Sequence, residues 1–208
     1  MDGKTVKANL GVLQVSTDWV IAGVGDFNGD GKSDILWRAL DGTVAIWEMN
    51  GAQIIGGGGV LLVPGDRTIV GVGDFKGDGN SDILWHNANS AVVIFEMNGV
   101  QISGGGGVLQ VSTDWSVVGV GDFNGDGKAD ILWRDANGAA VVWEMNGGGI
   151  IGSLGPQTVS TDWIANGLGD FNGDGKADIL WRNTNGNVSI WLNNGAAVVS
   201  SVSLGNVK

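Results

Sequence analysis

One acidic stretch recurs four times along the 208-residue chain. Its first copy, residues 25–38, reads GDFNGDGKSDILWR, and the copies follow at intervals of 48 residues, with leading aspartates at Asp26, Asp74, Asp122 and Asp170. Each copy carries three aspartates around two glycines. Asp, Asn and Gly are also ordinary turn residues, but four copies in one register disfavour simple solvated turns. Carboxylates at this spacing are the ligands that a hard cation needs, so the stretch predicts a repeated metal-binding loop.

The first loop has oxygen donors at alternate positions when it is numbered from its first aspartate. Positions 1, 3, 5 and 9 are side-chain donors, and position 7 offers its backbone carbonyl with its ammonium group in solvent: Asp26, Asn28, Asp30, Asp34 and Lys32. Gly29 and Gly31 permit the loop to curl, because glycine tolerates positive φ. An all-oxygen set suits Ca²⁺, whereas Mg²⁺ demands a stricter octahedron and Zn²⁺ prefers histidine or cysteine. The chain has one histidine and no cysteine.

An EF-hand is the main rival for such a loop, and the sequence excludes it. That loop needs a bidentate glutamate at position 12 and a helix on each side. Position 12 is a tryptophan in a β-like run in all four copies, namely Trp37, Trp85, Trp133 and Trp181. Position 9 must therefore supply the closing carboxylate.

The loop DFNGDGKSD and its copies resemble the calcium loops of FG-GAP/VCBS-type repeats, as found in the β-propeller of integrin α subunits and in many bacterial surface proteins. The resemblance covers nearly the whole chain, and it includes the phenylalanine after the first aspartate and the apolar strand after the last. It implies a loop that joins the first two strands of a blade and binds one Ca²⁺. The ligands that it implies in the third and fourth copies are Asp122, Asn124, Asp126, Lys128 and Asp130, then Asp170, Asn172, Asp174, Lys176 and Asp178.

The second loop departs from this pattern, because position 3 is Lys76. Its remaining candidate ligands are Asp74, Asp78, Asn80 and Asp82. A lysine donates no oxygen, so either its ammonium group takes the place of the metal or it points to solvent and water fills the gap. We expect this site to be the weakest or empty, which gives three to four Ca²⁺ per chain.

Composition and charge narrow the classes of partner. The net charge is -11, and the four loops, with three aspartates each, hold 12 of the 22 acidic residues. Lys and Arg total only 11, which disfavours nucleic acid and anionic membrane surfaces as partners. No window of 18 apolar residues predicts a membrane span. The chain shows no signal peptide, and loops without the position-12 glutamate are typical of extracellular modules that bind calcium at about 10⁻⁴–10⁻³ M. We therefore expect an extracellular or periplasmic location.

Short strands must position these loops. The first unit predicts strands at residues 19–24, 34–38, 43–49 and 53–63, with the loop at 25–33, a hairpin at Asn50-Gly51 and a break in the last strand at 56–59. The strands look buried on both faces. A four-stranded antiparallel sheet repeated at this period is typical of a β-propeller blade, so the fold class is all-β.

We interpret residues 1–208 as a single propeller domain with repeat cores at about 17–64, 65–112, 113–160 and 161–208. Residues 1–16 are an extra outer-strand segment, because the linking segment occurs five times and the central unit four times. Three architectures stay open: a closed four-bladed ring, a larger ring of two chains, or part of a longer propeller. The redundant terminal copy could complete the last blade or pair with another chain.

Other periodic residues predict structure more than catalysis. Three sets of aromatic positions repeat: the position-12 tryptophans, then Trp47, Phe95, Trp143 and Trp191, then Trp19, Trp115 and Trp163, where the second unit has Arg67. We expect the first two sets to form the core between blades and the third to be partly exposed, where it could stack on a sugar. Glu48, Glu96 and Glu144 repeat as well, and His86 replaces a surface arginine. No asymmetric catalytic constellation is present, so we expect no enzyme.

These features predict a non-enzymatic, calcium-stabilised binding module. A lectin or adhesion domain is one candidate, with a glycan or a cell-surface protein as its partner, in a monomer or a self-associated ring. A structural or engineered symmetric scaffold and an accessory domain of a polysaccharide-active enzyme are the alternatives. A glycan array would separate a lectin from a scaffold.

Overall fold

The fold is all-β, as predicted, in a computed structural model that describes residues 14–63, 65–153, 157–195 and 197–206. These residues form 17 strands and no helix, grouped in four antiparallel sheets that follow one another along the chain. Each sheet is called a blade here. Within the described ranges, no helix is long and apolar enough to cross a membrane.

The four blades share one up-and-down topology, in which each strand pairs with the next. The first two blades are β1 (Trp19–Gly25), β2 (Asp34–Ala39), β3 (Thr43–Asn50) and β4 (Gln53–Leu62), then β5 (Arg67–Gly73), β6 (Asp82–Asn87), β7 (Ala91–Asn98) and β8 (Gln101–Gln110). The third is β9 (Trp115–Gly121), β10 (Asp130–Asp135), β11 (Ala139–Asn146), β12 (Gly149–Ser153) and β13 (Gln157–Thr158), where β12 and β13 both pair with β11. The fourth is β14 (Trp163–Gly169), β15 (Asp178–Asn183), β16 (Asn187–Asn194) and β17 (Ala197–Asn206).

The second and third strands of each blade carry most of the buried side chains. Residues of β2 and β6 are buried on both faces. Each of these strands lies between two paired neighbours, and β6 also lies between two packed blades. The Asn50-Gly51 hairpin forms as predicted, with Gly51 at φ 63°. The expected break at 56–59 was wrong. β4 runs through these glycines, which pair with β3 between two bulges.

Apolar clusters join each blade to the next. Between the first two blades, for example, Phe27, Leu36 and Val44 pack with Ile83 and Trp85. Equivalent clusters join the second blade to the third and the third to the fourth. The core therefore lies between the blades, and each acidic loop is fixed by two blades at once.

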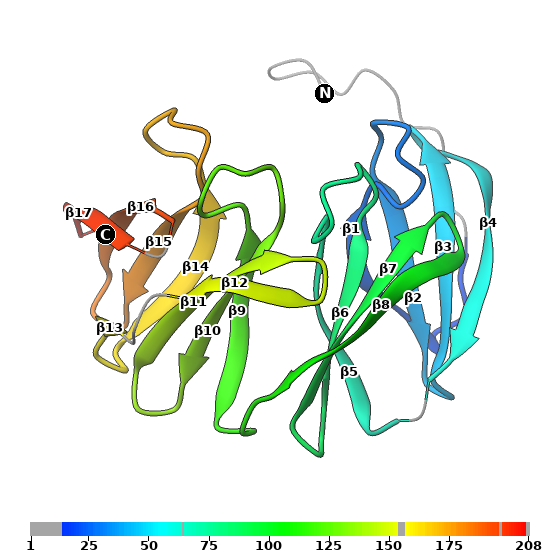
Figure 1. Cartoon of the computed structure of the whole chain (residues 1–208), viewed down its shortest axis with the longest axis horizontal. Helices are drawn as coiled ribbons and strands as arrows, with labels where there is room; N and C mark the ends of the chain where they lie inside the picture. Colours follow the sequence, from blue (N-terminus) through cyan, green and yellow to red (C-terminus); the bar gives the residue numbers. More distant parts are fainter. Residues whose placement is uncertain (1–13, 64, 154–156, 196, 207–208) are drawn as a thin grey trace.

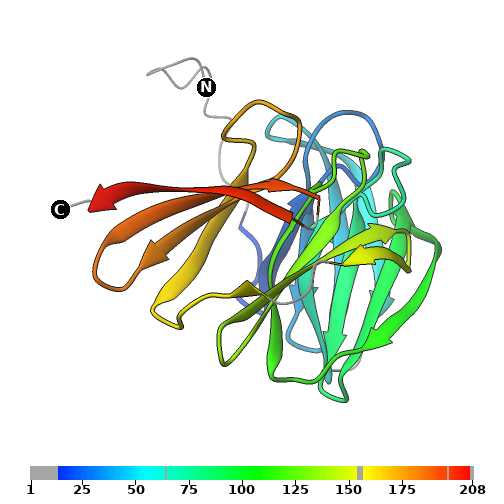
Figure 2. The same cartoon turned by 60° about the vertical axis from the view of Figure 1, so that its left-hand side comes forward.

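The blades form an open arc. The first strands of successive blades are neighbours, β1 with β5, β5 with β9 and β9 with β14, but no comparable contact joins β14 to β1 in the described residues. Figure 1 shows the blades in chain order from blue to red, and Figure 2 shows the fourth blade projecting from the others. The chain therefore does not form the closed four-bladed ring that the repeat count allowed. β17 completes the last blade, so the redundant segment is the N-terminal one, of which residues 1–13 lie outside the described residues.

Candidate functional site

Each acidic loop connects the first two strands of its blade and is curled by its two glycines. In the first loop, Gly29 has φ 72° and Gly31 has φ 81°, and the six equivalent glycines of the other loops are also positive. The sequence prediction that these glycines provide the curl is confirmed. A side chain at either position would be strained.

Side-chain oxygens of positions 1 and 3 converge inside the curled loop. Asp26 Oδ1 and Asn28 Oδ1 each lie 3.1 Å from the same nitrogen, the backbone N–H of Asp30. The third and fourth loops repeat this convergence on the N–H groups of Asp126 and Asp174. The second loop retains only the contact from Asp74, because Lys76 replaces the asparagine. In three of the loops, the side-chain oxygens of positions 1 and 3 therefore both accept a hydrogen bond from the same backbone N–H.

The position-9 aspartate is buried at the base of the loop and links it to the third strand. Asp34 is 0% exposed; its Oδ2 accepts the Phe27 N–H at 2.9 Å, and its Oδ1 accepts the Met49 N–H at 2.8 Å. The other three loops have the same pair of bonds, made by Asp82, Asp130 and Asp178. Sequence reasoning missed this second role, because the Met49 position lies 15 residues away on another strand. The invariant spacing from Asp34 to Met49 in all four repeats was the only available signal.

Burial perturbs two of these carboxylates. Burial raises the pKa of Asp82 to about 7, although the N–H groups of Met97 and Phe75 act against it and the charges of Asp74 and Asp78 add to it. Burial also raises the pKa of Asp130 to about 6, with opposing N–H bonds from Met145 and Phe123. Burial therefore favours the protonated form of the carboxyl group in these two loops, whereas a nearby cation would favour the ionised form.

Lysine side chains neutralise part of this charge. Lys32 Nζ lies 2.9 Å from Asp30 Oδ2, and Lys128 pairs with Asp126 in the same way. The ammonium group of Lys32 lies in solvent as predicted, since its side chain is 43% exposed, and it forms a surface ion pair, whereas the Lys128 side chain is 24% exposed. In the second loop, Lys76 Nζ lies 3.3 Å from Asp78 Oδ2 and 3.8 Å from Glu96 Oε2. The Lys76 side chain is also 46% exposed, so both alternatives for this lysine stay open.

The donor set fits a calcium ion, although the carboxylates are not gathered around one. In the part of the chain that the structure describes, no group of three or more His, Cys, Asp or Glu side chains is close enough to hold a metal. The position-9 carboxylates bind backbone N–H groups instead. All the donors are nevertheless oxygens of one curled loop, and the convergent oxygens of positions 1 and 3 suit a hard cation. The predicted metal ligands therefore stay a prediction.

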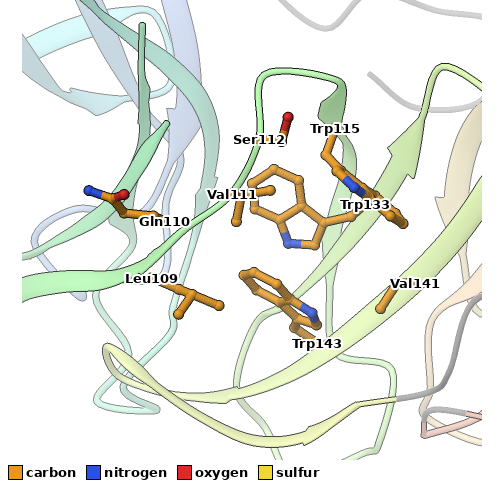
Figure 3. A pocket seen from close by; sticks show the side chains of 8 residues that line it. All are labelled: Leu109, Gln110, Val111, Ser112, Trp115, Trp133, Val141 and Trp143. Carbon is orange, nitrogen blue, oxygen red and sulfur yellow. The ribbon is translucent and has the colours of Figure 1, made fainter. Parts of the chain in front are cut away.

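A second candidate site lies between the second and third blades and is walled by tryptophans. Trp115, Trp133 and Trp143 line a pocket of about 230 Å³ together with Leu109 and Val111. Figure 3 shows the three indoles around this space, with Trp133 between the other two. The rings of Trp133 and Trp143 are 5.1 Å apart between centroids and tilted by 53°. Trp133 is buried, and its Nε1–H has no hydrogen-bond partner.

The pocket recurs at the next blade boundary. Trp163, Trp181 and Trp191 line an equivalent space of about 230 Å³, and Trp181 Nε1 is likewise buried without a partner. In the second blade Arg67 and Phe95 take two of the three positions. The expectation that the position-12 tryptophans form the core is confirmed, since all four are buried. The other two sets are half-buried, so the Trp47 set is more accessible than expected.

The His86 position serves the packing between blades. His86 Nε2 lies 3.1 Å from the Val111 carbonyl oxygen, and its ring meets Trp133 edge-on at 5.6 Å. Arg38 and Arg134, at the same position, lie over Trp85 and Trp181 at 5.1 and 5.2 Å. The interpretation of this position as an arginine on the surface was therefore wrong, because all three side chains are half-buried at a blade boundary.

Comparison with models of protein families identifies these repeats. A model described as FG-GAP-like repeat matches residues 26–85 and 74–133, and one described as FG-GAP repeat matches residues 163–203. The chain belongs to the FG-GAP-like repeat family. FG-GAP-like repeats are generally non-enzymatic, β-propeller-like binding modules, and they are typically extracellular. No curated protein sequence gives a significant match.

One solved structure with a TM-score above 0.5 shares the fold of this FG-GAP-like chain. A crystal structure of BBS1N in complex with ARL6DN, soaked with mercury, aligns with a TM-score of 0.51 and 14% identity over 92% of this chain and 56% of that chain. A crystal structure of the computationally designed Ika8 protein aligns with a TM-score of 0.44 and 14% identity over 84% of this chain and 48% of that chain. The chain thus spans about half the length of the structures that it matches.

Proposed function

We propose that this FG-GAP-like chain is a calcium-stabilised, non-enzymatic lectin that binds sugar rings in the tryptophan pockets of its third and fourth blades. The observation that supports this most is the pair of pockets walled by three tryptophans each, in which Trp133 and Trp181 also carry a buried Nε1–H without a partner among the described residues, as Trp37 and Trp85 do outside them. A buried donor without a partner costs about 1–3 kcal/mol. Because each Nε1 atom is itself inaccessible, a ligand hydroxyl would have to displace part of the pocket wall to accept this N–H and remove that cost.

The walls of the pocket suit the rest of a sugar ring. The half-buried indoles of Trp115 and Trp143 present apolar faces, on which the C–H face of a pyranose can stack. Pockets for drug-sized ligands have volumes of about 300–1,000 Å³, so a space of about 230 Å³ favours one ring over an extended ligand. Gln110 and Ser112 lie at the same wall and provide polar groups for the ring hydroxyls.

A glycan array of the whole chain tests this proposal. We expect reproducible binding to a defined sugar, followed by a loss of at least about tenfold in affinity when Trp115 and Trp163 are both changed to alanine. Leu40→Ala removes an exposed apolar side chain outside both pockets and is the matched control. An array without hits would favour a structural scaffold instead.

Calcium would stabilise the same module from its loops. The candidate ligands of the first loop are the side chains of positions 1, 3, 5 and 9 and the Lys32 carbonyl, and the third and fourth loops carry the same set. A bound Ca²⁺ would supply positive charge where three carboxylates share one loop, and an extracellular or periplasmic location would supply calcium at the concentration that such loops need.

Counting metal per chain tests this part separately from sugar binding. We expect three to four Ca²⁺ per chain by calorimetric titration and a lower melting temperature in chelator. The position-12 tryptophans follow each loop by three residues, so tryptophan fluorescence should follow the titration. A count of zero or one would remove calcium from the proposal and leave the tryptophan pockets to be judged by the array.

A further inference from the structure

Every internal boundary between blades uses the same pair of backbone hydrogen bonds. The Ser81 N–H donates to the Asp26 carbonyl, and the Gly99 N–H donates to the Phe27 carbonyl at 2.7 Å. The next two boundaries repeat both bonds through residues 48 and 96 positions further on. At the ends of the arc, the carbonyls of Asp170 and Phe171 and the N–H groups of Ser33 and Gly51 occupy the equivalent positions and make no such bond among the described residues. Gly51 is exposed, whereas the three equivalent hairpin glycines are buried.

At the same boundaries, a glycine of one blade packs against an aliphatic side chain of the next blade. A Cβ on Gly23 would lie 2.5 Å from Val72 Cγ2, and a Cβ on Gly71 would lie 2.6 Å from Val120 Cγ2. Gly119 meets Leu168 in the same way. At the open ends, Val24 is 58% exposed and a Cβ on Gly167 would meet nothing within 4 Å. One end therefore keeps an uncovered side chain, and the other keeps the glycine space that receives it.

Two further contacts complete the boundary and are missing at the ends. The loop phenylalanine is fully buried in the first three blades, yet Phe171 is 48% exposed. The side chain at the Arg38 position contacts a tryptophan ring of the next blade at all three internal boundaries, from above for Arg38 and Arg134 and edge-on for His86. Arg182 occupies that position in the last blade and is exposed, while Trp37 of the first blade is the matching ring.

We propose that the face of the fourth blade formed by Gly167, Asp170, Phe171 and Arg182 (the trailing face) docks onto the face of the first blade formed by Val24, Ser33, Trp37 and Gly51 (the leading face) of a second copy of this chain. The occupant is a second copy because each face holds the half of the contact that the other lacks, and the chain makes this contact three times within itself. Head-to-tail contacts close into a ring when the rotation permits it. Two chains then form one eight-bladed ring with two equal contacts. This inference is independent of calcium and of sugar binding.

The mass of the whole chain in solution tests the docking. By light scattering over a wide range of concentrations, we expect twice the chain mass of 21.4 kDa. A mass of one chain at every concentration would overturn the proposal.

Two substitutions, one on each face, test the geometry. Val24→Asp places a charge on the leading face, and Gly167→Val fills the space on the trailing face without meeting another atom of its own chain. We expect each to raise the dissociation constant of the dimer at least about tenfold with little change in melting temperature at low concentration. Ile55→Asp, on the exposed outer strand of the first blade, is the matched control and should leave the dimer intact. Dimers that survive both substitutions would contradict the docking.

Mixing the two variants separates head-to-tail docking from a symmetric contact between like faces. The Val24→Asp chain keeps its trailing face, and the Gly167→Val chain keeps its leading face. The mixture should therefore form a mixed dimer through one intact contact, although each variant alone is monomeric. A contact between two leading faces would respond to Val24→Asp alone and would give no recovery on mixing, and that result would overturn the proposal.

Discussion

The position-9 aspartate has two roles in each loop, one observed and one proposed. Both oxygens of Asp34 bind backbone N–H groups, one at the start of the loop and one at the end of β3. This explains why the carboxylate lies at the base of the loop, away from the convergent oxygens of positions 1 and 3. A calcium ion would share an oxygen that already has a structural partner. Loop shape and metal affinity are therefore coupled through one side chain.

Asp34→Asn separates these two roles. The amide keeps one acceptor but turns an N–H₂ group toward a buried N–H, so we expect a loss of about 1–3 kcal/mol in the free energy of unfolding, measured by urea denaturation in chelator. Asp18→Asn, on an exposed turn, is the control. If the variant is destabilised only when calcium is present, the carboxylate is a metal ligand and its N–H bonds add nothing.

Lys76→Asn tests why the second loop should be weak. The substitution restores the asparagine of the other three loops and removes the ammonium group that lies 3.3 Å from Asp78. We expect the number of Ca²⁺ bound per chain to rise by about one, measured by calorimetric titration. Lys4→Asn makes the same change outside the loops and is the control. An unchanged number would show that position 3 does not limit binding.

Stability of the metal-free chain should depend on the buried carboxylates. The pKa of Asp82 is raised to about 7 and that of Asp130 to about 6, both above the ordinary 3.8. The folded chain then binds more protons than the unfolded chain between about pH 4 and pH 7, so stability should fall as the pH rises through this window. Melting temperatures in chelator check this, and Asp82→Asn should flatten the slope. A melting temperature that rises between pH 4 and pH 7 would contradict the raised values.

At the scale of elements, the outer strand depends on a few glycines. Gly57 has φ 113°, and a Cβ there would lie 2.1 Å from the Ile46 carbonyl oxygen, whereas Gly59 has open space. Gly57→Ala should therefore lower the free energy of unfolding by about 2 kcal/mol or more, and Gly59→Ala should change it by less than about 1 kcal/mol. Chemical denaturation of both variants measures the difference. Equal effects would show that the backbone of β4 relaxes freely.

The sequence predicted the strands well, because their signals are local. Short apolar runs, the Asn50-Gly51 turn and the position of the acidic loop placed β1, β2 and β3 within one residue of their observed ends. The error in β4 has a physical cause. Glycine weakens a strand on its own, but here the paired backbone of β3 and the close approach of Glu48 to Gly56 hold the glycines in the sheet.

The loop was predictable in composition and curl but not in contacts. The spacing of the acidic and glycine residues predicted which groups are oxygen donors, and it predicted that Gly29 and Gly31 have positive φ. The pairing of Asp34 with Met49 and the pocket around Trp133 depend on how strands and blades meet. Such contacts join residues from different elements, and one repeat read by itself does not encode them.

At the scale of the molecule, the repeats do not specify where the arc stops. Four nearly identical units have nearly identical boundaries, so periodicity gives the contact between blades without giving the number of blades in a ring. The phenylalanine of the acidic loop shows this difference between an internal blade and the last one. Phe123 is fully buried by the following blade, and Phe171 has no following blade in this chain.

Truncating these two phenylalanines measures whether the arc is open. Both should be compared in the Val24→Asp background, which keeps copies of the chain apart. Phe123→Ala should then lower the free energy of unfolding by about 3–5 kcal/mol, because it leaves a cavity in a core. Phe171→Ala should lower it by no more than about 2 kcal/mol, because nearly half of the side chain is already in water. Equal losses on urea denaturation would mean that the first blade covers Phe171 within one chain, and the arc would have to be a closed ring of four.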